Sequence, residues 1–179
     1  MRTLKYVILG LLARKPMTGY DITKEFEAGI GLFWHAKHSQ IYPELNKLTD
    51  EKLIAFDIVI QGEKMEKKLY TITEKGRYEL RKWLLADEPL EPTPKDVFKL
   101  RVYLSEGLSD QELMQHMQRQ QKRRMQKLKT LKKFMTDNYE KIDIKELDPV
   151  RRADYFVLSG AILREQAYVD WLKRCIELI

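Results

Sequence analysis

A single predicted β-hairpin interrupts an otherwise helical sequence and fixes the order of elements in the first half of the chain. Residues 54–61 and 67–72 are rich in β-branched and aromatic side chains, and a charged turn that begins at Gly62 separates them. Capping residues and the spacing of apolar side chains predict three helices before the hairpin and one after it: residues 2–13, 19–29, from Ser39 onward, and from Thr73 to Leu84. This is the order of a winged helix-turn-helix domain, with a generic small α+β domain as the alternative.

A proline-rich stretch then divides the chain. Each proline removes a backbone donor and biases its predecessor away from helix, and three lie close together: Pro89, Pro92 and Pro94. We therefore expect a linker over residues 87–94, between a DNA-binding domain of residues 1–86 and a second domain of residues 95–179.

The second domain is predicted to be helical, with helices over residues 94–105, 109–138 and 150–178. The last two helices are amphipathic and too long to cover their apolar faces within one domain, so we expect a homodimer. The predicted dimer contacts are apolar positions of the last helix: Leu158, Ile162, Val169, Leu172 and Ile176. The predicted fold is thus mainly α with a small β-hairpin, a winged helix-turn-helix domain followed by a helical dimerisation domain.

The charge of the chain is compatible with nucleic-acid binding. Lys and Arg number 33 and Asp and Glu 27, so the net charge is +6. A local run, residues 119–133, carries many basic side chains and no acid, which fits either a solvated helix face or a binding surface.

The third helix and the hairpin hold the candidate DNA-binding residues. The N-terminus of a helix favours phosphate, and its first turns here combine amide, hydroxyl and aromatic groups. Lysines on the hairpin can contact phosphate as point charges, or can simply keep a hairpin soluble. The predicted DNA-binding residues are Ser39, Gln40, Tyr42, Pro43, Lys47, Lys64, Lys67 and Lys68.

Other classes of function find little support. The lone Cys175 and the absence of a signal peptide or a long apolar run fit a cytoplasmic protein without a membrane partner. His35 and His38 have a spacing that metal ligands use, but no further ligand completes a site, so we expect no metal and no cofactor. No nucleophile or phosphate-loop motif indicates an enzyme. A module that binds another protein is the remaining alternative to a DNA-binding regulator.

Four segments of the sequence resemble the PadR family of transcriptional regulators: residues 4–12, 18–22, 38–45 and 70–76. The strongest signals are Tyr42-Pro43 in the third helix and the Thr-x-x-Gly pattern of Thr73 and Gly76 after the hairpin. The resemblance extends over nearly the whole chain and is greatest to the members that repress phenolic acid decarboxylase genes.

This resemblance implies a homodimeric repressor on an inverted-repeat operator, released by a phenolic acid such as p-coumarate. Its target would be a phenolic acid decarboxylase gene. Other members respond to drug-like aromatic compounds and control efflux genes, which is the alternative. Asp154 stands where the resemblance leads us to expect a histidine, and its charge would disfavour a carboxylate ligand.

A flat effector with a carboxylate needs an aromatic slot and a cation or imidazole. We predict such a site at the domain junction, although these rings also fit ordinary packing. The candidate effector-binding residues are Tyr6, Trp34, His38, Tyr155 and Arg164.

Overall fold

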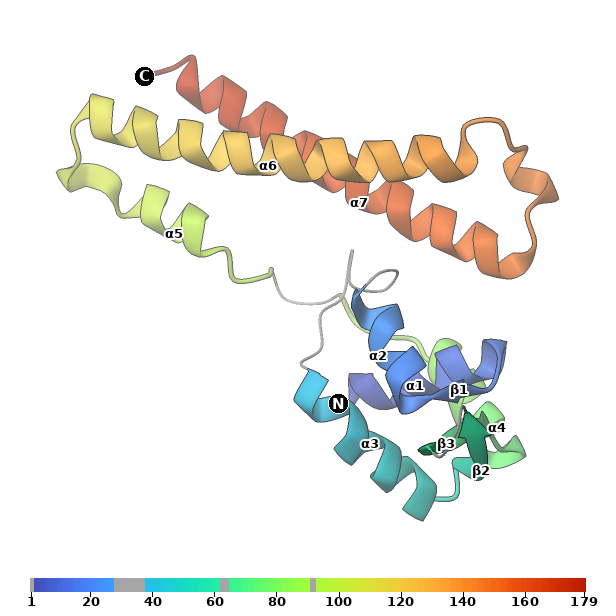
Figure 1. Ribbon diagram of the computed structural model, residues 1–179. Helices are drawn as coiled ribbons and strands as arrows, with labels where there is room; N and C mark the ends of the chain where they lie inside the picture. Colours follow the sequence, from blue (N-terminus) through green and yellow to red (C-terminus); the bar gives the residue numbers. More distant parts are fainter. Residues whose placement is uncertain (1, 28–37, 62–64, 91–92) are drawn as a thin grey trace. The chain divides into compact units, whose positions relative to one another are not determined.

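The computed structural model describes residues 2–27, 38–61, 65–90 and 93–179. It divides into two compact units, Met1–Leu90 and Glu91–Ile179, each of which folds around its own apolar residues (Figure 1).

The first unit has the helix and strand order of a winged helix-turn-helix domain. Its elements are α1 (Thr3–Arg14), β1 (Met17–Thr18), α2 (Gly19–Glu27), α3 (His38–Asp50), β2 (Ile54–Gln61), β3 (Met65–Ile72) and α4 (Glu74–Leu84). The strands form an antiparallel sheet in the order β1-β3-β2, with β2 and β3 paired along their whole length as the hairpin, or wing. The predicted fold class is confirmed.

Two features of this unit differ from the sequence prediction. The two-residue strand β1, in which Met17 pairs with Tyr70 and Thr18 with Leu69, was not predicted, because its partners are far away in the sequence. Ser39 lies inside the first turn of α3 rather than capping it, because that helix already begins at His38.

Local hydrogen bonds explain why α2 and α4 begin where they do. At α2, the Thr18 hydroxyl donates to Asp21 Oδ2 at 2.7 Å and accepts from the Asp21 backbone N–H at 3.2 Å. At α4, the Thr73 hydroxyl caps the helix by accepting from Gly76 N at 3.1 Å. Only glycine fits at position 76, because a Cβ there would lie 2.1 Å from the Leu53 carbonyl oxygen.

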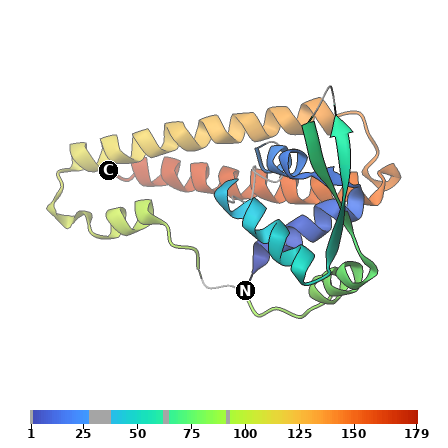
Figure 2. The same cartoon turned by 60° about the horizontal axis from the view of Figure 1, so that its bottom comes forward.

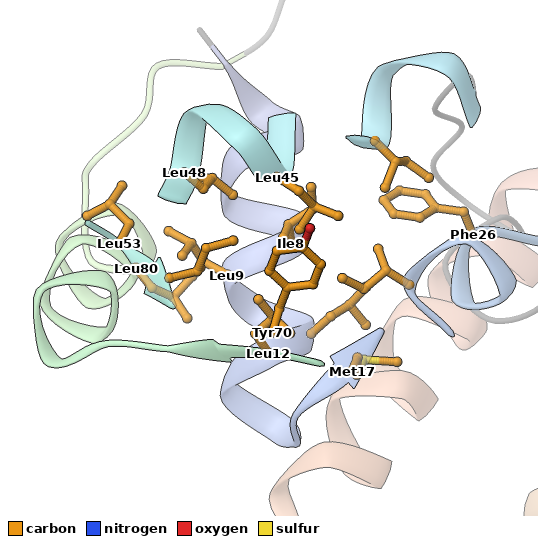
Figure 3. Packing of buried hydrophobic residues seen from close by; sticks show 14 residues of the cluster. Ile8, Leu9, Leu12, Met17, Phe26, Leu45, Leu48, Leu53, Tyr70 and Leu80 are labelled. Carbon is orange, nitrogen blue, oxygen red and sulfur yellow. The ribbon is translucent and has the colours of Figure 1, made fainter. Parts of the chain in front are cut away.

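The core of the first unit is formed by residues from each of its helices and strands (Figure 3). Ile8, Leu9 and Leu12 of α1 meet Leu45 and Leu48 of α3, and all five are buried. Burial of such side chains contributes about 1.5–3 kcal/mol each. This core holds one side of α3 in place and leaves its other side exposed.

The second unit consists of α5 (Val97–Tyr103), α6 (Asp110–Tyr139) and α7 (Pro149–Ile176), with 3₁₀ turns at Ser105–Gly107 and Ile144–Glu146. α6 begins with a capping box between Ser109 and Glu112. Figures 1 and 2 show α6 and α7 side by side, consistent with their extensive contact. In the described parts of the chain, no helix has the length and apolar character needed to cross a membrane.

Intrachain packing corrects the predicted dimer contacts at two positions. Leu158 and Leu172 are buried within their own unit, with exposed fractions of 5% and 0%, so their side chains are core residues rather than surface contacts. The buried residues of α7 recur at steps of three, four and seven: Leu158, Ala161, Glu165 and Leu172. Ile162, Val169 and Ile176 lie beside this line and are half-buried.

A buried acid lies within this apolar line. Glu165 is 1% exposed, and its carboxylate accepts from Arg124 at 3.0 and 3.1 Å and pairs with Lys127 at 3.1 Å. Burial acts to raise the pKa of Glu165, but the hydrogen bonds from Arg124 and Lys127 outweigh it and lower the pKa. Glu165 therefore stays ionised and links α7 to α6.

A second polar link connects α7 to α5. The Tyr168 hydroxyl donates to Asp96 Oδ2 at 2.8 Å, while Oδ1 of the same carboxylate caps α5 at Phe98 N and Lys99 N. Burial, and next the hydrogen bond to Asp96, raise the pKa of Tyr168 to about 12. The Arg124 guanidinium lies 4.0 Å from the centre of the Tyr168 ring.

Candidate nucleic-acid interface

The exposed side of α3 presents the polar residues predicted to contact DNA. These side chains are all exposed on the helix: Ser39, Gln40, Tyr42, Pro43 and Lys47. Pro43 lies inside the helix without ending it. The structure therefore presents these side chains together on one exposed surface, along with Asn46.

The opposite side of α3 is fixed by an ion pair as well as by the core. Glu44 is 7% exposed, and its Oε1 accepts from Arg2 Nη2 at 2.6 Å and Arg2 Nε at 3.1 Å. Arg2 also bonds Glu51, and these contacts raise the pKa of Arg2. The pairing of Glu44 with Arg2 helps to hold α3 against α1.

A hollow of about 610 Å³ lies between α3, the wing and the start of α2. Its lining residues come from these three places: Thr18, Gly19, Tyr20, Tyr42, Asn46, Glu66, Lys67, Lys68 and Tyr70. Three of the predicted DNA-binding residues, Tyr42, Lys67 and Lys68, are thus brought together. Lys64 lies outside the described residues.

Gly19 determines where the Tyr42 ring lies. A Cβ on Gly19 would be 2.7 Å from Cε1 of Tyr42, so only glycine lets the ring lie against the start of α2. At the floor of the hollow, burial and then the neighbouring Tyr42 raise the pKa of Tyr70, so its hydroxyl stays protonated at neutral pH.

The wing contributes a cation, Lys68, that is held by an aromatic contact. Lys68 is exposed, and its Nζ lies 4.2 Å from the centre of the Phe56 ring on β2. Its charge is thereby presented at the edge of the hollow. Positive charge beside a helix with exposed amide and hydroxyl groups suits a nucleic acid, in which phosphates border base edges.

Six lining residues were not among the predicted DNA-binding residues: Thr18, Gly19, Tyr20, Asn46, Glu66 and Tyr70. Asn46 could have been found, because it follows Tyr42 by four residues and so shares its helix face. Tyr20 is 55% exposed and comes from α2, so only the tertiary fold places it near α3.

The predicted effector residues are described only within their own units. Tyr6, in the first unit, stacks on Trp83 with ring centroids 4.6 Å apart. Tyr155, in the second unit, packs edge-on against Tyr139 at 5.4 Å, and Arg164 is exposed. Trp34 and the side chain of His38 lie outside the described residues, so the effector site stays a prediction.

The described residues contain no cluster of three or more His, Cys, Asp or Glu that could hold a metal ion. His35 lies outside the described ranges.

Three helices followed by a hairpin wing, with one side of the third helix exposed, define the class of winged helix-turn-helix proteins. Comparison with known proteins gives the family. Residues 8–82 match the model of the transcriptional regulator PadR-like family, and residues 94–179 match the model of the virulence activator alpha C-terminal domain.

The full chain also matches characterised relatives. It is 45% identical to the negative transcriptional regulator PadR of Bacillus subtilis, over 100% of this chain and 98% of that protein. The crystal structure of Bacillus subtilis PadR in complex with operator DNA superposes with a TM-score of 0.92 at 44% identity, covering 99% of both chains. The structure of the same protein in complex with p-coumaric acid gives a TM-score of 0.87 at 41% identity, covering 99% of this chain and 98% of that one.

The chain belongs to the PadR-like family of transcriptional regulators, and it is a regulator rather than an enzyme.

Proposed function

We propose that this protein is a homodimeric transcriptional repressor that binds an inverted-repeat operator and is released by a phenolic acid such as p-coumarate. The observation that carries the DNA-binding part is the hollow that joins α3 to Lys67 and Lys68 of the wing. The crystal structure of Bacillus subtilis PadR in complex with operator DNA, a protein 44% identical to this chain over 99% of both chains, supports a DNA-binding role for this surface. We also infer a cytoplasmic location, where such a regulator meets its DNA.

α3 is the proposed recognition helix. Ser39, Gln40 and Asn46 supply groups that bond base edges in a major groove, while Lys67 and Lys68 supply phosphate contacts beside it. Gln40 is the residue best suited to specificity, because an amide can bond an adenine at two atoms.

Dimerisation is proposed from the apolar surface that the second unit leaves exposed. Val97 and Leu100 of α5 and Leu104 just after it are 59%, 55% and 63% exposed. On α7, Phe156 and Leu163 are 58% and 70% exposed. Exposed apolar residues in this number suit a protein interface. Together with the half-buried Ile162, Val169 and Ile176, they replace Leu158 and Leu172 as the proposed contacts.

The proposed effector is a phenolic acid, which would make a phenolic acid decarboxylase gene the expected target. It is supported by the 41% identical Bacillus subtilis protein that was crystallised with p-coumaric acid. We retain Tyr6, Trp34, His38, Tyr155 and Arg164 as the candidate contacts.

One residue favours a second candidate effector. Asp154, next to Tyr155, is exposed and negatively charged, and an acid near the site would disfavour a carboxylate and suit a cationic aromatic compound. A repressor of an efflux gene that responds to such compounds is therefore the alternative.

Selection of duplexes from a random pool, followed by anisotropy titration, tests the repressor proposal. A dimer should select inverted repeats whose half-site centres lie about one helical turn, roughly 34 Å, or a multiple of it apart. Selection of unrelated sequences without symmetry would refute it. Calorimetry with p-coumarate and with a cationic dye then distinguishes the two effectors, because only one should bind.

A further inference from the structure

The outward face of α6 is strongly basic and belongs to no site described so far. From Leu113 to Thr136 the helix contains no acidic residue. Five exposed cations lie on it: Arg119, Lys122, Arg123, Lys129 and Lys133. At 3.6 residues per turn these five lie within about 120° of one another around the helix. We call them the α6 basic face.

The inner side of the same helix is fully used in packing. Met117, Leu128 and Leu131 are buried. Two further cations of the run also serve the fold, since Arg124 and Lys127 neutralise Glu165. The buried residues lie roughly opposite the α6 basic face on the helix circumference. The five cations of that face, by contrast, form no ion pair with any residue in the described ranges.

Their arrangement has a cost that packing does not explain. Arg119 with Arg123, and Lys129 with Lys133, are like charges four residues apart, which destabilise a helix. A bound polyanion would remove that repulsion.

The surface beside these lysines can also donate hydrogen bonds. A shallow hollow of about 370 Å³ is lined by Gln118, Gln121, Lys122, Met125, Gln126 and Lys129. Amide side chains next to lysines are typical donors to phosphate and sugar oxygens. Met125 and Phe134 are the large apolar residues exposed on α6, and they lie on different sides of the helix, so α6 has no continuous apolar face with which to enter a lipid bilayer.

The dimensions suit a nucleic-acid backbone. Arg119 and Lys133 are about 21 Å apart along the helix axis at about 1.5 Å per residue. Along the DNA axis each strand carries one phosphate per about 3.4 Å, so a duplex segment of this length holds about six phosphates per strand.

We propose that the α6 basic face binds the phosphate backbone of double-stranded DNA outside the operator, without sequence preference. The inference rests on the proposed DNA-binding function and extends the contact with DNA to the second unit.

The test compares two duplexes: a selected operator of minimal length, and the same operator extended by about one helical turn, roughly 10 base pairs, on each side. Anisotropy titrations over a range of salt concentrations give the slope of log affinity against log salt. Each phosphate neutralised contributes about 0.9 to the magnitude of this slope. The variant Lys122→Gln/Lys129→Gln/Lys133→Gln removes three charges and keeps helix propensity.

The wild-type slope should be steeper on the extended duplex than on the minimal one. The triple variant should lose up to about 2.7 of that slope per protomer on the extended duplex and keep its affinity for the minimal duplex. The matched control, Lys141→Gln/Lys145→Gln/Arg174→Gln, removes three exposed cations from elsewhere in the unit and should behave as wild type.

Equal slopes of wild type on the two duplexes, or of the triple variant and wild type on the extended one, would overturn the proposal. An equal loss of slope in the control variant would also overturn the proposal, because the effect would then depend only on the net charge of the protein. These outcomes leave operator binding intact, whereas absence of selective binding to the minimal duplex would refute the proposed function itself. Loss of binding to anionic vesicles or to a poly-glutamate peptide, with DNA slopes unchanged, would assign the face to another partner.

Discussion

Replacing Gly76 by alanine should strongly destabilise the first unit, although alanine is the better helix former. Gly76 lies in α4, where a Cβ would come within 2.1 Å of the Leu53 carbonyl oxygen and 2.8 Å of Ile72 Cγ1. That oxygen already accepts hydrogen bonds from Thr73 N at 3.1 Å and Thr73 Oγ1 at 3.0 Å. The helix therefore cannot move away without weakening the bonds that position it.

The size of the effect follows from these contacts. Overpacking costs about 1–3 kcal/mol. Two weakened hydrogen bonds cost about 0.5–1.5 kcal/mol each. The gain in helix propensity offsets about 1 kcal/mol. The net loss therefore lies between about 1 and 5 kcal/mol. At its midpoint of about 3 kcal/mol it should lower the melting temperature of this unit by about 12–24 °C.

Differential scanning calorimetry measures this change, and the chain offers a matched control. Gly10 of α1 is also helical, but a Cβ there would meet nothing within 4 Å. Gly10→Ala should therefore melt at or above the wild-type temperature. A Gly76→Ala protein that melts with or above wild type would refute the packing argument for the Thr-x-x-Gly pattern.

Three further predictions concern recognition of the operator sequence, packing of the second unit and the pH dependence of stability. Gln40→Ala should weaken operator binding by about 1–3 kcal/mol and leave binding to random DNA unchanged, whereas Lys68→Ala should weaken binding to both equally. Anisotropy titrations on operator and random duplexes measure both effects, and an equal loss on the two duplexes for Gln40→Ala would refute its role in specificity. Leu172→Asp should unfold the second unit, because it places an unpaired charge at a fully buried position, and a native-like melting curve would refute that. Burial, and then the charges of nearby arginines, lower the pKa of His116. The contribution of neutral His116 to the free energy of unfolding is therefore fully present above about pH 6.5, the ordinary histidine pKa, and is lost as the pH falls toward the lowered pKa. His116→Phe should flatten this dependence in thermal melts between about pH 7 and 5, and an unchanged dependence would exclude His116 as its source.

The sequence predicted features that depend on local signals. The capping residues Thr73 and Ser109 lie at the starts of α4 and α6, and the hairpin was recognised from its composition. Such signals act over three or four residues, so no knowledge of the tertiary fold is needed. The exposed residues of the third helix could be predicted from the helical spacing of apolar positions alone.

Features that depend on distant partners were not predictable in this way. Apolar spacing identified Leu172 as buried but could not say whether its own chain or a second copy covers it. The burial of Glu165 was not predicted, because its partners, Arg124 and Lys127, are about 40 residues away in the sequence. Tyr20 reaches the hollow beside α3 only because of how α2 and α3 pack.

The most direct test of ligand-responsive repression is a linkage measurement with p-coumarate and the selected operator. Anisotropy gives operator affinity with and without p-coumarate, and calorimetry gives p-coumarate affinity with and without operator. An effector that releases the repressor should weaken operator binding by about 5- to 150-fold, and operator should weaken p-coumarate binding by the same factor. If p-coumarate binds the free and the operator-bound protein equally, or binds neither, it is not the ligand that releases this repressor.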